Sequence, residues 1–410
     1  MSENTRKPST GDSIGTDDLF SLMDKEFNKK FRSNPAQRLS DYRKDIPKLW
    51  YSTGIMTLDV ALGGGLAGGR MSEWFGLEGS GKSTLLYSAI AESQRRHREG
   101  FHDYHVIADP ENSSSDAKAH MELLGVDTSK VHIIAPQEGK PLYAEDIFER
   151  IEWILRHPNL KGRIGIIGID SIGALVSKTE GENDKKWDKA ARVGGISGVL
   201  SMFLRSVVDS GLLYEADAHL LMLNQVRDNI GDMYNPYRTP GGRKVHFTAA
   251  QRVEVARTRG ADFKNPAYNS QKENSGEAMY TGQKIKFKQV KSKVGGRDGA
   301  TASVDFVYGE GLDLAQNAIQ VGQMHNIIVG STWLSMIDVA TGQEVVKKQG
   351  MQNMKNTVLE DEELYAKFDY MLTYVLRGLE PKSVVDEWEE IKATELNLDE
   401  GNALVENPTE

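Results

Sequence analysis

The chain contains no cysteine in its 410 residues, which excludes a disulfide scaffold, thiolate metal ligands and a cysteine nucleophile. It also lacks any run of about 18 consecutive apolar residues, so we expect no membrane-spanning helix. The N-terminal segment MSENTRKPSTGDSIG has no apolar core of the kind found in secretory signals. Charged residues (27%) and apolar residues (39%) are close to globular averages, which argues against extensive disorder. We therefore expect an intracellular, cytoplasmic protein with more than one structural part.

The acidic balance of the chain is concentrated at one end. There are 59 Asp+Glu against 50 Lys+Arg, for a formal net charge of −9. Residues 386–410 contain nine acidic residues and one lysine, so this tail carries −8 of the total. The rest of the chain is nearly neutral, and net charge therefore says little about its partners.

Four segments follow from the pattern of apolar residues. Residues 1–16 are a polar tail, and the stripe of apolar residues between Asp17 and Phe31 predicts an amphipathic helix. That helix packs either on its own body or on a neighbouring subunit, and both interpretations stay open. The organisation predicted for the whole chain is a tail, helix and linker (1–50), a core (51–312), a small C-terminal domain (313–385) and an acidic disordered tail (386–410).

Short apolar runs alternate with amphipathic helices from Tyr51 to about Gly311. This alternation predicts a mostly parallel α/β sheet covered by helices. Residues 313–380 are predicted to be helical, including Asp361–Arg377. The strands are predicted at Met71–Phe75, Tyr104–Ala108, Val131–Ala135, Gly165–Ile169, His219–Leu223, Arg252–Ala256 and Lys284–Val290, and the helices at Thr84–Arg96, Ala144–Arg156 and Ile196–Ser210.

A phosphate-binding loop follows the first of these strands. The segment Gly76-Leu-Glu-Gly-Ser-Gly-Lys-Ser83 fits G-x-x-x-x-G-K-[ST] and lies between a predicted strand and a predicted helix, as the motif requires. Glycines allow backbone N–H groups to wrap the phosphates, Lys82 reaches the β- and γ-phosphates, and the Ser83 hydroxyl ligates Mg²⁺. The candidate nucleotide-binding residues of this loop are Gly76, Glu78, Gly79, Ser80, Gly81, Lys82, Ser83 and Thr84.

Two acidic residues lie at the ends of predicted strands. Asp170 ends the apolar strand Ile164–Ile169, where an acid of a P-loop protein holds the Mg²⁺ shell together with Ser83. Glu111, in Asp109-Pro-Glu111, ends the strand that follows the P-loop helix, and it is a candidate for orienting the attacking water. The alternatives without a catalytic role are that Asp170 caps the next helix and that Glu111 is a solvated loop residue.

The segment after Asn224-Gln225 combines bases, aromatics and glycines. Gln225 ends an apolar strand and could hydrogen-bond a γ-phosphate. The loop that follows carries residues that can neutralise phosphates, stack on bases and allow motion, which suits contact with a single nucleic-acid strand, although an ordinary surface loop remains the alternative. Its candidate DNA-binding residues are Arg227, Tyr234, Arg238, Gly241, Gly242, Arg243 and Lys244.

These motifs together resemble the bacterial RecA recombinase family. The likeness runs in one order from Ser52 to about Gly311 and comprises STGIMTLDVALGGGLAGGR, GLEGSGKS, ADPE, LLGVD, GIDSIGAL, EGE…AAR, NQVRDNIG, PGGRKVHF, KQVKSKV and VYGEG. It implies a RecA-type P-loop core, an N-terminal helix and a small C-terminal α/β domain. It also implies an ATP- and Mg²⁺-dependent recombinase that binds single- and double-stranded DNA as a helical homo-oligomeric filament and promotes strand exchange.

The resemblance also implies residue roles. Lys82, Glu111 and Gln225 fall on the catalytic residues, with Glu111 as the water-activating acid and Gln225 as the γ-phosphate sensor. Lys291 and Lys293 fall on paired lysines that reach the neighbouring subunit's ATP, whereas their pattern alone would indicate solvated lysines on a strand. Phe247 and Arg252 lie in the segment that carries the allosteric signal, and Tyr308 falls in the nucleotide site.

Two DNA loops correspond to residues 178–188 and 226–243. The first contains the candidate DNA-binding residues Lys185, Lys186 and Trp187, and Arg192, which follows it, is a further candidate. Tyr234 falls on an aromatic that inserts between bases. The sequence departs from the family where an adenine-stacking tyrosine is expected, since His120 lies nearest. The segment Gly260–Gly282 is longer and more polar, and the divergence between motifs suits a virus-encoded member, so bacterial or viral origin stays open.

Three further alternatives stay open at this point. A ring-shaped helicase shares this core and would translocate on DNA, and a filament that coats single strands with weak ATP hydrolysis would need the same loops. The acidic tail is either a solubility tail or a DNA mimic that competes for the basic loops.

Overall fold

The computed structural model describes residues 16–30, 49–97, 100–137, 141–183, 195–228, 237–258, 281–376 and 378–393. The chain divides into two compact units, Met1–Asp45 and Ile46–Glu410. The described part of the first unit is helix α1 (Thr16–Lys30), which ends in two lysines, as the helix dipole favours. The predicted amphipathic helix is therefore confirmed, and several of its apolar side chains are exposed: Leu19, Phe20, Leu22 and Met23.

The second unit is built on a nine-stranded sheet formed by the described residues. In sheet order the strands are β13 (Gly311–Leu312), β12 (Thr301–Val307), β11 (Gly282–Ser292), β10 (Gln251–Thr258), β3 (Met71–Gly76), β7 (His219–Gln225), β6 (Ile164–Ile169), β4 (Tyr104–Ala108) and β5 (Val131–Ile134). The strands from β10 to β5 run parallel, and those from β10 to β13 pair antiparallel. The predicted mostly parallel sheet is confirmed.

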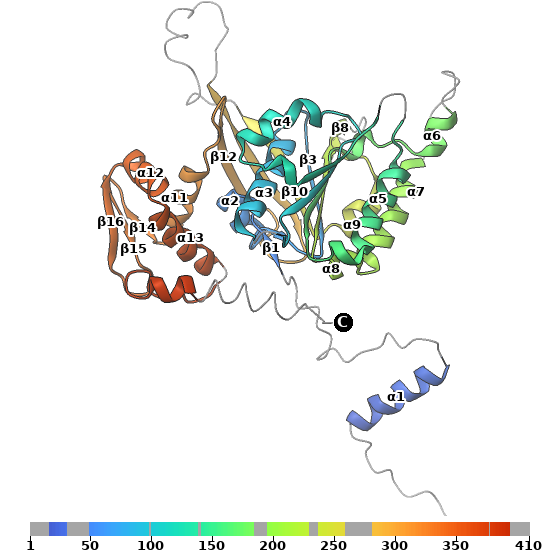
Figure 1. Cartoon of the computed structure of the whole chain (residues 1–410), viewed down its shortest axis with the longest axis horizontal. Helices are drawn as coiled ribbons and strands as arrows, with labels where there is room; N and C mark the ends of the chain where they lie inside the picture. Colours follow the sequence, from blue (N-terminus) through green and yellow to red (C-terminus); the bar gives the residue numbers. More distant parts are fainter. Residues whose placement is uncertain are drawn as a thin grey trace, which may run out of the picture. The chain divides into compact units, whose positions relative to one another are not determined.

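Helices cover both faces of this sheet (Figure 1). One face packs against α2 (Met56–Leu62), α3 (Lys82–Arg96) and α4 (Ser114–Leu123). The other packs against α5 (Ala144–Arg156), α7 (Gly195–Leu204), α8 (Leu212–Glu215) and α9 (Gly242–Thr248). Strand β6 is buried along its whole length because it lies between both layers, which explains its continuous apolar run.

Short elements connect these layers. Strand β1 (Trp50–Tyr51) pairs with β2 (Leu66–Ala67), and β8 (Arg227–Asp228) pairs with β9 (Tyr237–Arg238). Helix α6 (Lys178–Asn183) is short, and α7 continues into a π-helical turn at Arg205–Asp209. The predicted helix Ile196–Ser210 is thus present but changes its winding in its second half.

The C-terminal region combines helices with a second sheet. Helices α11 (Leu314–Met324), α12 (Met351–Glu360) and α13 (Glu362–Leu376) pack on an antiparallel sheet of β14 (Ile328–Gly330), β15 (Trp333–Ile337) and β16 (Glu344–Gln349). The helical prediction for residues 313–380 is therefore wrong over these three strands. In β15 the consecutive residues Leu334, Ser335 and Met336 are all buried, so the strand has no inside–outside alternation from which a period of two could be read. Trp388 and Ile391, in the segment assigned to the acidic tail, are buried in the same core.

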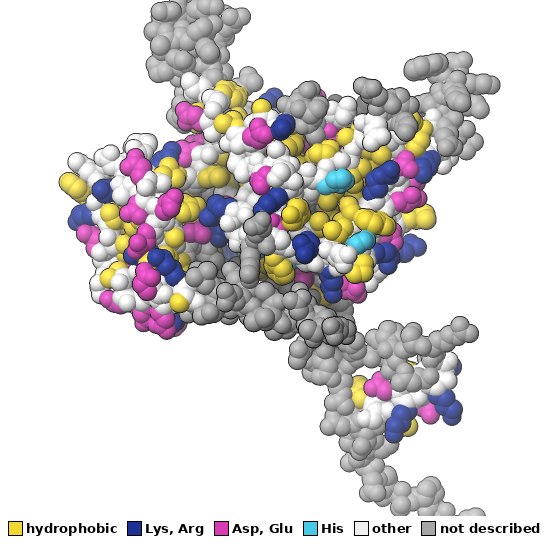
Figure 2. Space-filling model, in the orientation of Figure 1, with side chains coloured by type: hydrophobic (Ala, Val, Ile, Leu, Met, Phe, Trp, Pro, Cys, Tyr) yellow, Lys and Arg dark blue, Asp and Glu magenta, His cyan; other side chains and the backbone are white. Residues whose placement is uncertain are grey.

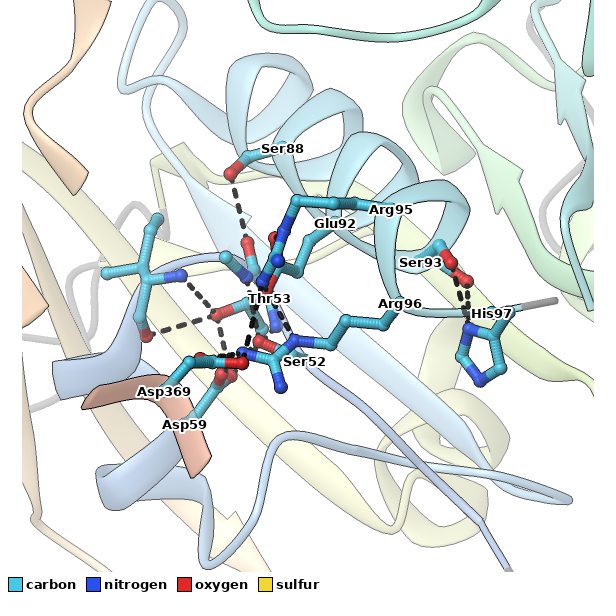
Figure 3. Close-up of polar contacts among 12 residues, drawn as sticks. Ser52, Thr53, Asp59, Ser88, Glu92, Ser93, Arg95, Arg96, His97 and Asp369 are labelled. Carbon is cyan, nitrogen blue, oxygen red and sulfur yellow. Dashed lines mark hydrogen bonds and ion pairs between the residues drawn. The ribbon is translucent and has the colours of Figure 1, made fainter. Parts of the chain in front are cut away.

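An ionic cluster joins this region to the end of α3 (Figure 3). Arg96 donates a hydrogen bond of 2.7 Å to Asp369 of α13, and it also pairs with Glu92 on its own helix. Arg95 binds Glu92 as well, at 2.7 Å. Burial opposes the charge of Arg96, yet Asp369 and Glu92 raise its pKa above the ordinary value. Helix α3 therefore begins at the phosphate loop and ends on the C-terminal region.

In the described part of the chain, no helix is long and apolar enough to cross a membrane.

Candidate active site

The phosphate loop connects β3 to α3 through glycines that no other residue could replace without strain. Gly79 and Gly81 have φ angles of +63° and +99°, which L side chains rarely adopt. A Cβ at Gly76 would lie 2.0 Å from the Val255 carbonyl oxygen of β10. The loop therefore lies close against the end of β10, and its backbone N–H groups precede the N-terminus of α3.

Lys82 is held inside this loop. Its ammonium donates to the carbonyl oxygens of Gly76 (3.1 Å) and Leu77 (2.9 Å) and lies 3.4 Å from the Ser80 hydroxyl. Burial lowers the pKa of Lys82, and the charge of Asp170 opposes that shift. These partners are neutral, so an incoming phosphate would be the stronger acceptor for this cation.

Ser83 and Asp170 meet where α3 begins and β6 ends. The Ser83 hydroxyl donates to Oδ2 of Asp170 at 2.6 Å. Burial raises the pKa of Asp170, the Ser83 hydrogen bond lowers it, and Glu111 raises it further. A hydroxyl and a carboxylate are the hard oxygen donors that Mg²⁺ prefers, so this pair fits the ion. Among the described residues no group of three or more His, Cys, Asp or Glu side chains could hold a metal, so phosphate and water oxygens would have to complete the shell.

Glu111 follows β4, which lies next to β6 in the sheet. Its Oε1 accepts a hydrogen bond of 2.9 Å from the hydroxyl of Ser171, the residue after Asp170. The structure therefore brings Glu111 beside Asp170 at the carboxyl ends of two adjacent strands. That edge is where ligands bind in parallel sheets.

Gln225 ends β7 directly beside the phosphate loop. It is the register partner of Gly76, and the next backbone N–H, of Val226, donates to the Gly76 carbonyl oxygen at 3.3 Å. Gln225 is half-buried. Gln225 therefore lies beside the phosphate loop and directly precedes the predicted DNA loop.

His120 lies against the start of α3. Its Nε2 is 3.1 Å from the Thr84 hydroxyl, and its ring packs edge-on against Tyr87 and Phe306. Phe306 in turn contacts Tyr308, which is nearly half exposed. Burial lowers the pKa of His120. The structure thus gathers His120, Thr84 and Tyr308 into one aromatic region beside the phosphate loop.

Lys291 and Lys293 are engaged with α9 rather than with the phosphate loop. Lys291 donates to the carbonyl oxygens of His246 and Phe247, and Lys293 donates to that of Phe247. Burial lowers the pKa of Lys291 to about 8, and the charges of Lys293 and Arg252 add to the effect. Phe247 is 69% exposed, so this corner of the molecule presents an apolar side chain beside two cations.

The predicted DNA loops are described in part. Arg227 and Arg238 are register partners on β8 and β9, and both are exposed. Gly241 and Gly242 adopt φ angles of +94° and +76° where α9 begins, next to exposed Arg243. Lys244 pairs with Asp209. The remaining candidates lie outside the described residues: Lys185, Lys186, Trp187, Arg192 and Tyr234.

Three residues beside the site were missing from the sequence prediction. Glu73 and Asn224 hydrogen-bond each other at 2.8 Å between β3 and β7. Arg257 lies at the loop, since a Cβ at Gly79 would be 2.9 Å from its guanidinium. A usable signal was the charge of Glu73 within the predicted strand Met71–Phe75, but the partners of Glu73 depend on strand order.

The fold and this site define a P-loop nucleotide-binding protein with a RecA-type core. The family model "RecA N-terminal domain" matches residues 20–313, so the chain belongs to the RecA family. The chain is similar to "Protein RecA" of Aquifex aeolicus (32% identity, covering 77% of this chain and 81% of the relative). It is also similar to "Protein RecA" of Bacillus subtilis (30%, 92% and 97%) and of Chlorobaculum tepidum (32%, 82% and 86%). These matches support an ATP-dependent recombinase and favour neither the ring helicase nor the passive coat.

Proposed function

We propose that this chain is a DNA-dependent ATPase that forms a filament on single-stranded DNA and promotes homologous pairing and strand exchange. The observation that carries the proposal is the convergence of Lys82, Ser83, Asp170 and Glu111 at adjoining strand ends. A binding module without turnover would not need a carboxylate beside the metal pair. The site of action would be the cytoplasm, or the host cell's cytoplasm if a virus encodes the chain.

Each residue has a distinct task in ATP hydrolysis. Lys82 leaves its carbonyl partners to bind the β- and γ-phosphates, and Ser83 and Asp170 hold Mg²⁺. The bound ion would neutralise charge that develops on the phosphates. Glu111, oriented by Ser171, positions the attacking water and accepts its proton. His120, Thr84 and Tyr308 lie beside the phosphate loop and would contact the nucleotide's base. His120 stands where the family has an adenine-stacking tyrosine, so this chain would differ in its preference among nucleotides.

Filament assembly would complete the site with groups from a second copy. The contacts of Lys291 and Lys293 with described residues are hydrogen bonds to the backbone carbonyl oxygens of His246 and Phe247, which are neutral acceptors, so a neighbour's γ-phosphate would be a stronger partner for both cations. The visible face of the molecule mixes charges of both signs with apolar side chains (Figure 2). Tyr104, Ile133 and Trp153 are exposed near the β5 edge of the sheet, and subunit contacts would cover such side chains.

DNA would bind through Arg227, Arg238, Arg243 and the Gly241-Gly242 pair at the start of α9. Phosphate neutralisation by arginines is independent of sequence and weakens steeply with salt. Gln225 would report the γ-phosphate to this loop, so that ATP binding and DNA binding reinforce each other. Hydrolysis would then release the DNA.

The deciding experiment is electron microscopy of the protein with single-stranded DNA and a slowly hydrolysed ATP analogue. We expect extended helical filaments that vanish without nucleotide and that Lys82→Ala does not form. Lys161→Ala, which changes an exposed lysine outside the site, is the matched control and should form filaments normally. Closed rings would support the motor interpretation instead, and nucleotide-dependent filaments of Lys82→Ala would refute the assigned loop.

A further inference from the structure

A fully buried carboxylate, Glu73, lies in the middle of the sheet three residues before the phosphate loop. Its Oε2 accepts a hydrogen bond of 2.6 Å from Nε of Arg252 on β10. Its Oε1 accepts one of 2.8 Å from Nδ2 of Asn224 on β7. Since β3 lies between β10 and β7, this one side chain connects both neighbouring strands.

Asn224 extends the connection to the predicted DNA loop. Its Nδ2 also donates to the carbonyl oxygen of Pro240 at 2.9 Å. Both partners are acceptors, so the amide nitrogen must face both of them. The Oδ1 atom is then left buried without a hydrogen-bond partner among the described residues. Asn224 directly precedes Gln225, and Pro240 directly precedes Gly241, so this amide joins the two ends of the loop.

Arg252 extends the connection in the other direction. Its guanidinium lies 4.7 Å from the centre of the Phe75 ring, and its backbone is the register partner of Lys291 on β11. Lys291 binds carbonyl oxygens of α9, the helix that follows Gly241. His246 of α9 lies 2.6 Å, through Nε2, from the Thr239 hydroxyl. Two chains of contacts therefore connect Lys291 to the C-terminal end of the DNA loop. One runs through Arg252, Glu73 and Asn224, and the other runs through α9.

We propose that Glu73 is a positioning residue that couples DNA binding at the 226–243 loop to ATP hydrolysis. This inference rests on the proposed function of the same site. The buried carboxylate holds Arg252 on one side and Asn224 on the other, so a displacement of Pro240 by DNA changes the position of Asn224 and of the adjoining Gln225. Through Arg252 the same displacement reaches the strand that carries Lys291 and Lys293.

Both carboxylate oxygens of Glu73 accept hydrogen bonds, so a substitution that turns one acceptor into a donor tests the two contacts. Glu73→Gln keeps the size of the side chain but presents one acceptor and one donor. If its oxygen faces Arg252, its amide nitrogen faces Asn224, which must turn Oδ1 toward it and release Pro240. The opposite orientation places two donors against each other at Arg252. In either case one of the two links breaks while the strand stays filled.

A second substitution removes the Asn224 side of the connection. Asn224→Ala removes the hydrogen bonds to both Pro240 and Glu73 Oε1, and it leaves the Glu73–Arg252 ion pair in place. The matched control is Glu254→Gln, which removes an exposed carboxylate from the same strand as Arg252. Comparison of the three variants distinguishes the effect of losing the Asn224 contacts from the effect of losing the Glu73–Arg252 ion pair and from the effect of a changed net charge.

The experiment measures ATP turnover of the full chain against single-stranded DNA concentration, together with DNA-free turnover and KM for ATP. We expect Glu73→Gln and Asn224→Ala to retain DNA-free turnover and KM within about twofold, and to lose at least about fivefold of the stimulation by DNA, the lower range of typical couplings. Glu254→Gln should be stimulated like the wild type.

Several outcomes would overturn the inference. Normal stimulation in both variants would do so, as would an equal loss of DNA-free turnover and stimulation, which indicates a structural role only. If Glu73→Gln does not fold, Asn224→Ala decides alone. Absence of DNA stimulation in the wild type would instead refute the proposed function itself, so the two failures can be told apart.

Discussion

The hydroxyl of Ser83 donates a 2.6 Å hydrogen bond to the carboxylate of Asp170, although 87 residues separate them in the chain. The contact forms because β6 ends beside the helix that starts at the phosphate loop. It holds a hydroxyl and a carboxylate together at the end of the phosphate loop. The protein therefore preorganises the two groups assigned to Mg²⁺.

Asp170→Asn tests that assignment. The amide fills the same space and still accepts a hydrogen bond from Ser83, but it cannot contribute a charge to the ion. We expect Mg²⁺-dependent ATP turnover to fall at least about 10–100-fold, as for altered partners of other metal sites, with a higher Mg²⁺ concentration needed for half activity. Glu215→Gln, an exposed carboxylate on α8, is the control. An unchanged Mg²⁺ dependence would contradict the metal role.

Glu111→Gln tests the water-positioning role. The amide can keep the contact with Ser171 but cannot accept a proton at neutral pH. We expect turnover to fall about 10²–10⁴-fold, the usual contribution of a general base, while ATP-dependent DNA binding persists. Single-turnover kinetics and filter binding measure the two effects separately. Unchanged turnover would show that another group is the base.

The Arg96–Asp369 ion pair connects α3 to α13, and we expect it to contribute to the free energy of unfolding. Arg96 and Asp369 are only 24% and 18% exposed, so the pair lies between the surface and buried classes. We expect Asp369→Asn to cost about 1–3 kcal/mol of unfolding free energy, since Arg96 retains Glu92 as a partner. Thermal unfolding at low and high salt measures the loss.

The matched control is Glu363→Gln, which breaks a pair on the same helix whose carboxylate is 55% exposed, although the Lys367 side chain is only 19% exposed. We expect a smaller change there, because a solvent-exposed carboxylate gains little from an ion pair. Equal effects of the two substitutions would show that the ionic cluster at the end of α3 is not a specific attachment.

The buried side chain of His219 should make the free energy of unfolding fall at acidic pH. Its Nδ1 donates to the Ala67 carbonyl oxygen at 2.8 Å, and its Nε2 is buried without a partner among the described residues. Burial lowers the pKa of His219 to about 4, from about 6.5 in an unfolded chain. The unfolded state therefore binds more protons between these values, and stability present above pH 6.5 is lost as pH falls toward 4, by about 2–3 kcal/mol.

Thermal melts between pH 7.5 and 4.5 measure this loss. His219→Asn keeps a donor near the Nδ1 position and does not titrate, so its melting temperature should fall less on acidification. His132→Asn, at an exposed position on β5, should behave like the wild type. A pH dependence of His219→Asn equal to the wild type would place the acid sensitivity elsewhere, for instance at buried His105.

The local sequence pattern was enough to predict the phosphate loop and most of the helices and strands of the core. The glycines and Lys82 lie within one turn, and the stripe at Ile147, Ile151 and Leu155 makes α5 amphipathic whatever surrounds it. Gln225 and Glu111 were predicted as strand-end residues for the same reason. The strands of the C-terminal sheet were missed because they are not continuous apolar runs like the core strands: β16 (EVVKKQ) has no fully buried residue, and β14 has only three residues.

The sequence by itself determined the P-loop motif, the alternating elements of the core and the residue types available for ATP and DNA. It also determined family membership, through motifs that keep one order along the chain. Only the tertiary structure decided that Ser83 meets Asp170 and that Glu73 joins Arg252 to Asn224. Those contacts depend on the sheet order β10-β3-β7-β6-β4, which is set by crossover connections and packing of both helical layers rather than by neighbouring residues.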